Sequence, residues 1–597
     1  MLTDPAASAG TTTEAARPGA SGTSADADAG LPGGRRWGPL LVAAWVVQVV
    51  VRLAFASGQS MPVATPDETG YLFAARVLAG GPPADMSYGT VYRGGYPMLL
   101  APVFALVHDP ETVYRLCLAV NALVGALVLP LGYVLLRRFG LTRGRALLFA
   151  NVVALLPATV FYSEFVLTDA ILPAVVLGWL LLAHTWFTSA SPRVQAASAV
   201  GASLLAGYAC VTHSRGAVII AVHAVLLLVA AVRRWRPFWQ TALAAAALGA
   251  LFLAGTKLND HLFQVLYPMG DNDLEGNLRR RLTTSDGLGW TFSLAVGQLW
   301  YLIIGTGGLA GVGLLGCGSL AFRRGTEARL RMVALAVLAS IAGIALATSA
   351  ALPDEIRVGN YVYGRYLACF TPLLVGAGIA VLVRASRRTL ALAAAGTVAL
   401  AAASGAAVFL YAGDRLTKYV FTPFDFPESS FLTMDWQRFH LWRATAAGLA
   451  LLGLAVLVVW ALRGRKAMIV LAGALAVVEV GMTGTATAEI SRPLVRRFTP
   501  ITDLDGLAAP HDRVAVDWQV PWKLRLPMLY NVWWHKNVEF DGNRRRPPAS
   551  RADLIILNWR KGVPPERTWR HGKPPQGWHI VGTRTSPEGG WVAWRHS

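Results

Sequence analysis

Apolar runs of about 20 residues recur along most of this chain, and they constrain its fold more than any other feature. A helix of that length matches the hydrocarbon thickness of a bilayer. Only 15% of the 597 residues are charged, against about 25% in a soluble domain. The sequence therefore predicts a polytopic α-helical membrane protein and excludes a soluble enzyme, a coiled coil and a disordered scaffold. It predicts about thirteen spans, near residues 38–57, 113–136, 146–161, 169–188, 196–212, 216–232, 239–256, 292–321, 328–350, 364–383, 389–411, 441–462 and 467–487.

Basic residues are scattered between the apolar runs, and they indicate how the chain crosses the membrane. The net charge is +20, but no basic cluster has the form of a nucleic-acid-binding site. Positive charge in short loops is typical of the cytoplasmic side. If the N-terminus is cytoplasmic, the cytoplasmic loops hold the arginines of segments 137–145, 193, 233–236, 323–331, 384–388 and 463–466. The sequence thus predicts a multi-pass cell-membrane protein with a cytoplasmic N-terminus and an extracytoplasmic C-terminus.

Composition divides the chain into three parts. Residues 1–36 are rich in Ala, Gly, Ser and Thr and are expected to form a disordered cytoplasmic tail. Residues 37–488 form the transmembrane module, which includes a long first external loop at 58–112. The apolar run at 96–107 is too short to cross and is expected to be re-entrant or interfacial.

Residues 489–597 read as a small extracytoplasmic α/β domain. A helix is expected to start near Ile501, followed by strands at 513–518, 537–540, 553–558, 579–583 and 591–594. The turn residues Pro587–Gly590 separate the last two strands, so these two are expected to pair as a hairpin.

The first external loop carries two adjacent acids, Asp67 and Glu68, directly after Pro66. Proline suits the first turn of a helix, and acids there complement the positive end of the helix dipole. The simpler interpretation is therefore that both acids only cap an interfacial helix. A carboxylate at this place could also accept a proton from an attacking hydroxyl group.

Further charged residues are expected on the same external side, and each has a simpler interpretation. Asp169 lies where the third and fourth spans meet and could be a helix cap. His213 and Arg215 fill a tight turn, where they could pair with headgroup phosphates. Lys257 begins a loop that could be a solvated charged face. Arg365 could extend to the membrane interface, and Glu479, inside the last span, could form an interhelical hydrogen bond.

Together these groups place carboxylates and cations on one membrane face. Guanidinium groups can hold a phosphate and offset the charge of a phosphate leaving group. An acid can activate the attacking hydroxyl. The combination predicts group transfer from a lipid phosphate outside the cytoplasm, and the sequence contains no Walker-type loop for ATP.

Three short motifs resemble the GT-C superfamily of membrane glycosyltransferases. Residues 66–71 (PDETGY) resemble its acidic first-loop motif, residues 165–169 (FVLTD) the segment that opens its fourth span, and residues 363–367 (YGRYL), followed by Pro372, its late Gly-Arg-Tyr element. The branches most similar to this chain are the lipid A aminoarabinose transferases and the protein O-mannosyltransferases. Thirteen spans and a small external domain also match the former branch.

The resemblance implies an inverting transferase that moves a hexose or pentose from a polyprenyl phosphate to a hydroxyl of a cell-envelope glycan, lipid or protein. Asp67, Glu68 and Asp169 match the family's acids. Arg365 matches a donor-phosphate ligand, and Arg93 matches a basic residue of the first loop. His213, Arg215 and Lys257 are assigned to phosphate binding by position alone. Some members use a divalent metal ion, for which Asp67 and Glu68 are the candidate ligands.

Two other classes of function stay open. A transporter or flippase of a lipid-linked sugar would place ionisable residues near the middle of the membrane and often shows repeated halves. A glycan-binding membrane protein would use the tryptophans of the C-terminal domain. In that case the first-loop acids would be dispensable.

Overall fold

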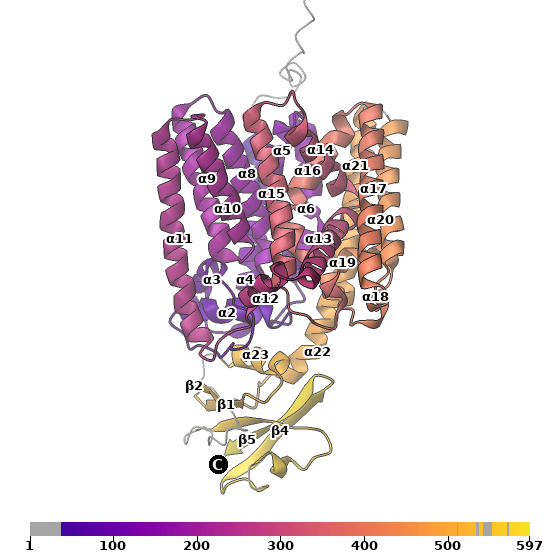
Figure 1. Ribbon diagram of the computed structural model, residues 1–597. Helices are drawn as coiled ribbons and strands as arrows, with labels where there is room; N and C mark the ends of the chain where they lie inside the picture. The colour runs from indigo at the N-terminus through magenta and orange to yellow at the C-terminus, as the bar shows by residue number, and fades with distance from the viewer. Residues whose placement is uncertain (1–36, 463, 510, 533–535, 541–551, 570–571) are drawn as a thin grey trace, which may run out of the picture.

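The computed structural model describes residues 37–462, 464–509, 511–532, 536–540, 552–569 and 572–597. The predicted tail at 1–36 lies outside these residues. A bundle of long helices makes up most of the molecule, and a small sheet domain with the C-terminus lies beyond one end of the bundle (Figure 1). The fold class predicted from the sequence is therefore confirmed.

The bundle contains ten helices that are long and apolar enough to span a membrane, or eleven if the bent pair at 143–164 is one span, among the described residues. Shorter apolar helices complete it, and the predicted count of thirteen stays a prediction. The bundle helices are α1 (Trp37–Ala56), α4 (Pro110–Gly125), α5 (Val128–Arg138), α6 (Arg143–Leu155), α7 (Pro157–Val160), α8 (Leu172–Thr188), α9 (Pro192–Thr212), α10 (Gly216–Val232), α11 (Phe238–Leu266), α13 (Ser285–Gly305), α14 (Leu309–Phe322), α15 (Ala328–Ala351), α16 (Thr371–Arg384), α17 (Arg387–Ala412), α20 (Leu441–Ala461) and α21 (Gly464–Ala486).

Not every predicted span is a single helix, and residues 292–321 show one reason. Residues 292–321 are divided between α13 and α14 at Gly307 and Gly308, both of which have positive φ. Glycine adopts this left-handed conformation without steric cost, so the pair ends one helix and begins another. A hydrophobicity pattern alone does not show such a break.

Short helices gather at the end of the bundle that faces the sheet. They include α2 (Asp67–Leu78), α3 (Gly95–Leu106), α12 (Leu274–Leu282), α18 (Arg415–Lys418) and α19 (Pro427–Thr433). The α2 helix begins at Asp67 after Pro66, as the sequence predicts. At 12 residues, α3 is too short to cross a bilayer.

The last bundle helix continues out of the bundle toward the sheet. A π-helical turn, η8 (Thr487–Ser491), joins α21 to α22 (Arg492–Thr502). The expected helix start near Ile501 is therefore wrong, because a helix ends there. The change in composition near residue 489 marks where the helix leaves its apolar surroundings, and Pro493 fits within the first turn of α22.

All five predicted strands are present: β1 (Arg513–Asp517), β2 (Lys536–Phe540), β3 (Leu554–Asn558), β4 (Trp578–Ser586) and β5 (Gly589–His596). Their order in the sheet is β2-β1-β3-β5-β4. Strand β1 pairs in parallel with β2 and β3, and β4 and β5 form the predicted antiparallel hairpin. Helix α23 (Trp522–Asn531), which the sequence did not predict, lies between the sheet and the bundle (Figure 1).

The sheet domain shares a buried core with the first external loop. Tyr71 and Leu72 of α2 belong to the same apolar cluster as Leu524 and Tyr530 of α23. The two parts are also joined by hydrogen bonds, among them one from the Tyr530 hydroxyl to the Pro110 carbonyl at 2.8 Å. The domain is therefore packed firmly against the bundle.

Candidate active site

A cavity of about 1150 Å³ lies where the first external loop, the helix ends and the sheet domain meet. Among the residues predicted from the sequence to form a site, six line this cavity: Asp67, Arg93, Asp169, His213, Arg215 and Arg365. They come from segments up to 298 positions apart in sequence. The structure thus brings most of the predicted site together in one place.

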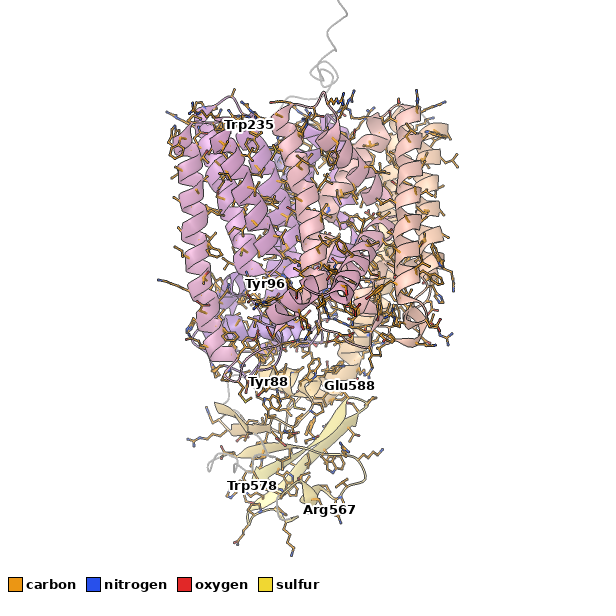
Figure 2. All side chains as sticks on the ribbon, viewed as in Figure 1. Tyr88, Tyr96, Trp235, Arg567, Trp578 and Glu588 are labelled. Carbon is orange, nitrogen blue, oxygen red and sulfur yellow. The ribbon has the colours of Figure 1, made fainter. Side chains whose placement is uncertain are left out.

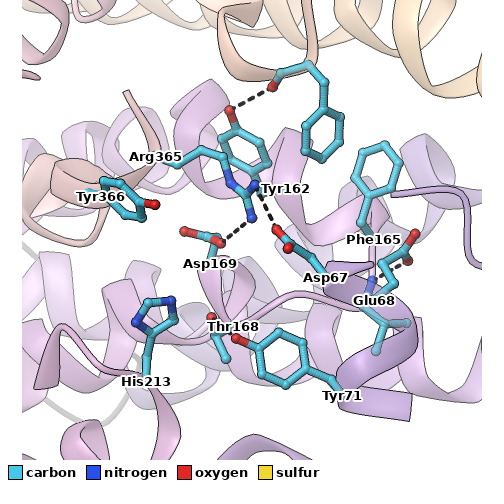
Figure 3. Close-up of polar contacts among 12 residues, drawn as sticks. Asp67, Glu68, Tyr71, Tyr162, Phe165, Thr168, Asp169, His213, Arg365 and Tyr366 are labelled. Atoms are coloured by element: carbon cyan, nitrogen blue, oxygen red, sulfur yellow. Dashed lines mark hydrogen bonds and ion pairs between the residues drawn. The ribbon is translucent and has the colours of Figure 1, made fainter. Parts of the chain in front are cut away.

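Two acids and two arginines form a continuous chain at this cavity, and Figure 3 shows Arg365 between Asp67 and Asp169. Arg365 donates from Nη1 to Asp67 Oδ2 at 3.0 Å and from Nη2 to Asp169 Oδ2 at 3.2 Å. Arg215 donates from Nη2 to Asp169 Oδ1 at 2.9 Å. The order of charges is therefore Asp67, Arg365, Asp169, Arg215, and the four charges sum to zero.

Of the two acids in this group of four side chains, Asp67 is the more accessible. Its side chain is 35% exposed, whereas that of Asp169 is 2% exposed. The Tyr92 hydroxyl donates to Asp67 Oδ1 at 2.8 Å, and Arg365 holds the other oxygen. Both contacts fix the direction of the carboxylate while leaving part of it open to the cavity.

Asp169 is buried in the short 3₁₀ turn η4 (Thr168–Ala170). Burial alone would raise its pKa, but the adjacent Arg215 and Arg365 outweigh burial and hold the pKa well below its usual range. Asp169 is therefore a permanent anion that anchors two guanidinium groups.

Arg365 and Arg215 are held by more than the acids. Arg365 lies in η6 (Arg365–Phe370). Its guanidinium packs on the rings of Tyr162 and Phe424, and its Cζ lies 5.4 Å from the centre of each ring. Arg215 donates to the carbonyl of Arg365 at 2.9 Å. These contacts set both cations in fixed positions rather than letting them extend into solvent.

His213 lies beside this chain and serves as an acceptor on one side. Its Nδ1 accepts hydrogen bonds from the backbone N–H of Arg215 at 3.1 Å and from its Nε at 3.3 Å. Burial, followed by the charge of Arg215, lowers the pKa of His213 well below its usual value. The ring is therefore neutral near pH 7, with the proton on Nε2, and it can donate one hydrogen bond.

Glu68 does not line the cavity. It is fully buried, and its Oε1 accepts from the Tyr114 hydroxyl at 2.5 Å and from the backbone N–H of Val166 at 2.8 Å. Its Oε2 accepts from the backbone N–H groups of Val63 and Ala64, at 2.8 and 2.7 Å. Glu68 thus joins the segment before α2 to the segment that carries Asp169.

The two remaining predicted residues differ in position. Arg93 lines the cavity and donates from Nη1 to the Cys210 carbonyl at 2.6 Å. Lys257 is exposed on α11 and is not among the cavity residues.

The donor groups at the site do not suit a divalent metal ion. Asp67 and Glu68 point to different partners, and a guanidinium already bridges Asp67 and Asp169. Within the described ranges, no three His, Cys, Asp or Glu side chains gather in a metal-binding group. A hard cation would need several carboxylate oxygens directed at one point.

Several cavity residues were not found by sequence reasoning, and Asp425 is the most notable. Asp425, in η7 (Pro423–Asp425), is 5% exposed, and its Oδ2 lies 3.9 Å from Arg357 Nη1. Burial raises the pKa of Asp425 to about 6, although Arg357 and Arg365 oppose that shift. The only available signal was that charged residues are expected on the external side, and it did not single out this residue.

Comparison with known proteins gives the context of this geometry. Residues 91–257 match the family model described as dolichyl-phosphate-mannose-protein mannosyltransferase. The structure resembles ArnT from Cupriavidus metallidurans bound to undecaprenyl phosphate, with a TM-score of 0.53, 17% identity and coverage of 94% of this chain and 98% of that one. For ArnT in the apo state the TM-score is 0.50, the identity 18% and the coverage 94% and 97%.

The chain has the GT-C fold. A smaller part, 38% of this chain and 33% of the other, aligns with the S. cerevisiae Pmt1-Pmt2 protein O-mannosyltransferase complex bound to the sugar donor, at 21% identity and a TM-score of 0.28. No curated protein sequence matches the chain. The similarity to ArnT over nearly the whole chain confirms the predicted fold, and the long apolar helices confirm the multi-pass membrane architecture.

Proposed function

We propose that this GT-C protein is an inverting glycosyltransferase that moves a hexose or pentose from a polyprenyl phosphate to a hydroxyl of a cell-envelope acceptor. The chain of Asp67, Arg365, Asp169 and Arg215 at the cavity carries the proposal. It combines an accessible carboxylate with fixed guanidinium groups, which are the two kinds of group that such a transfer requires. The segment that matches the mannosyltransferase family model and the similarity to ArnT support it.

In the proposed reaction, Asp67 is the general base. The acceptor oxygen attacks the anomeric carbon of the sugar and forms the new C–O bond, while its proton passes to Asp67. The bond between the anomeric carbon and the phosphate oxygen breaks on the opposite face. Its electron pair leaves with the polyprenyl phosphate, and the configuration at the anomeric carbon is inverted.

The charge balance of the site favours this direction of transfer. The four charges of the chain sum to zero while Asp67 is ionised. When Asp67 takes a proton, the group gains one positive charge just as the leaving phosphate gains one negative charge. Arg365, Arg215 and Arg93 are then available to stabilise the phosphate, and His213 can donate a hydrogen bond from Nε2 without adding charge.

The other predicted residues take supporting roles in this proposal. Asp169 positions the two arginines, and Glu68 joins the backbone before Asp67 to the segment that carries Asp169. Because a guanidinium bridges Asp67 and Asp169, the reaction is proposed to need no divalent metal ion. We expect turnover to be unchanged when the purified protein is assayed in excess EDTA, and a loss that Mg²⁺ or Mn²⁺ restores would contradict this.

The direct test is to incubate the purified protein, in liposomes, with radiolabelled undecaprenyl-phosphate sugars and cell-envelope acceptors. We expect release of undecaprenyl phosphate and formation of a glycoside with inverted configuration. Arg365→Ala should abolish both products. Movement of the intact labelled lipid across the membrane, without cleavage, would instead show a flippase.

A further inference from the structure

The outer wall of the cavity is built by the C-terminal part of the chain. Arg497 of α22, Trp518, Trp522 and Lys523 line it, together with Glu588 from the turn between β4 and β5. Figure 2 places Glu588 and Tyr88, a residue of the first external loop, at the level between the bundle and the sheet. The cavity therefore has two distinct sides. One side holds the acid–arginine chain, which is the group of Asp67, Arg365, Asp169 and Arg215. The other side is the wall formed by the C-terminal part of the protein.

This wall is held in place by contacts that α2 and α22 make with the sheet domain. Arg76 of α2 donates to the Leu529 carbonyl of α23 at 3.1 Å. The Trp591 indole donates to the Ile501 carbonyl at 2.8 Å, and Arg497 forms an ion pair with Glu588. Helix α23 thus faces the cavity from a fixed position, as a preformed binding surface requires.

Aromatic surface is exposed on this wall. Trp522, the first residue of α23, is 44% exposed, and Tyr88 is 56% exposed. Tyr88 meets Trp518 edge to face, with ring centres 6.1 Å apart, and the Arg525 guanidinium covers Trp518 at 4.4 Å. Large aromatic side chains left open at a cavity are typical of ligand contacts, because covering them with a ligand is favourable.

Two cationic hydrogen-bond donors lie beside this aromatic surface. The Lys523 ammonium lies 5.5 Å from the centre of the Trp522 ring and can donate. The Arg497 guanidinium, 49% exposed, can donate, and the Glu588 carboxylate, 11% exposed, holds it in an ion pair. Sugar rings present C–H groups on one face, which pack on aromatic rings, and hydroxyls at the edge, which both donate and accept. The wall therefore has the surface chemistry that a carbohydrate requires.

The size of the cavity leaves room for a second substrate. Single small-molecule sites occupy about 300–1000 Å³, and this cavity occupies about 1150 Å³. One sugar with its phosphate, bound at the acid–arginine chain, leaves the α23 side free. A peptide recognised through its backbone would need an open strand edge. The described residues that line the cavity include none from β4, an edge strand of the sheet.

We propose that this wall, formed by Arg497, Trp518, Trp522, Lys523 and Glu588, is an acceptor subsite for a carbohydrate chain, with one sugar ring on Trp522 and its hydroxyls bonded by Lys523 and Arg497. This inference rests on the proposed transferase function and specifies the acceptor as a glycan.

The test measures binding of soluble hexasaccharides of glucose, mannose, galactose and arabinose to the full-length protein in nanodiscs. We expect at least one to bind, and Trp522→Ala to weaken it about tenfold or more. Trp522→Phe, which keeps a ring, should lose less. Trp442→Ala is the matched control, because Trp442 is 46% exposed but lies on α20, away from the cavity.

Lysine variants give a second comparison. Lys523→Ala should weaken the same hexasaccharide, and Lys561→Ala, an exposed lysine of the sheet domain that is not a cavity residue, should not. The inference is overturned if no hexasaccharide binds, if Trp522→Ala binds like the wild type, or if only a Ser/Thr-containing peptide binds. Undecaprenyl phosphate binding, measured in parallel, should be unchanged in every variant. Its absence from the wild type would overturn the transferase proposal instead.

Discussion

At the scale of single residues, the accessibility of Asp67 distinguishes it from the other acids of the site. Asp67→Asn keeps the size of the side chain and an oxygen that can accept from Tyr92 or Arg365, but it removes the basic group. We expect normal folding, near-normal donor binding and a loss of turnover of at least about a hundredfold, the usual contribution of a general base. Turnover with a lipid-phosphate sugar, beside a thermal melt, measures this.

Asp271→Asn is the control for Asp67→Asn. Asp271 is an exposed aspartate of another loop and is not a cavity residue. Its substitution should leave turnover unchanged. A well-folded Asp67→Asn protein that transfers sugar at the wild-type rate would leave Asp67 only a structural role, as the partner of Arg365 and Tyr92.

Asp425 gives a prediction that depends on pH. Its pKa in the folded protein is about 6, against about 3.9 in an unfolded chain. The folded state therefore binds the proton more tightly, and ionisation of Asp425 lowers stability as pH rises from about 4 through 6. Asp425→Asn removes that cost, so its melting temperature relative to the wild type should be more favourable at pH 7.5 than at pH 4.5. A difference with the opposite sign, or none, would contradict the assignment.

At the scale of elements, Asp67 and Glu68 show what a sequence motif leaves open. Consecutive residues of a helix point about 100° apart, so two adjacent acids at a helix start cannot share one direction. One faces the cavity and the other enters the protein. The motif predicted where the helix begins, but which acid faces the cavity depends on Tyr114 and Val166, which lie elsewhere in the sequence.

Glu68→Gln tests the structural role of Glu68. The amide replaces one acceptor oxygen with a donor that faces a backbone N–H or the Tyr114 hydroxyl, and an unsatisfied buried polar group costs about 1–3 kcal/mol. We expect a lower melting temperature with a partial loss of turnover. Glu111→Gln, at a side chain that is 51% exposed, should leave the melt unchanged. Full stability with a hundredfold loss of turnover would instead make Glu68 a catalytic group.

The elements that the sequence predicted have local signals, and those it missed do not. The five strands follow alternating or apolar runs between turn residues, and α2 follows a proline and two acids. Helix α23 contains Pro527, which is ordinarily a sign against a helix interior. Its place at the cavity depends on contacts with α2, more than 400 positions away in sequence. The four residues of the acid–arginine chain could each be predicted from the sequence, but the cavity wall that includes α23 could not.

At the scale of the whole molecule, the cavity lies at one end of the bundle and the basic loops at the other. Trp235, next to Arg233 and Arg234, lies at the end opposite the sheet (Figure 2). Positively charged loops stay in the cytoplasm during insertion, so the sheet and the cavity are expected outside. An extracytoplasmic cavity also suits a proposed acceptor of the cell envelope.

Reporter fusions test this orientation. A phosphatase that is active only outside the cytoplasm should be active when fused after Ser597 and inactive when fused at Arg324, whereas a reporter that fluoresces only in the cytoplasm should behave in the opposite way. The two sites lie at opposite ends of the bundle, between α14 and α15 at one end and after β5 at the other. Both fusions on one side would contradict the span arrangement. A complete reversal would keep the fold but place the cavity, and with it the proposed transfer, in the cytoplasm.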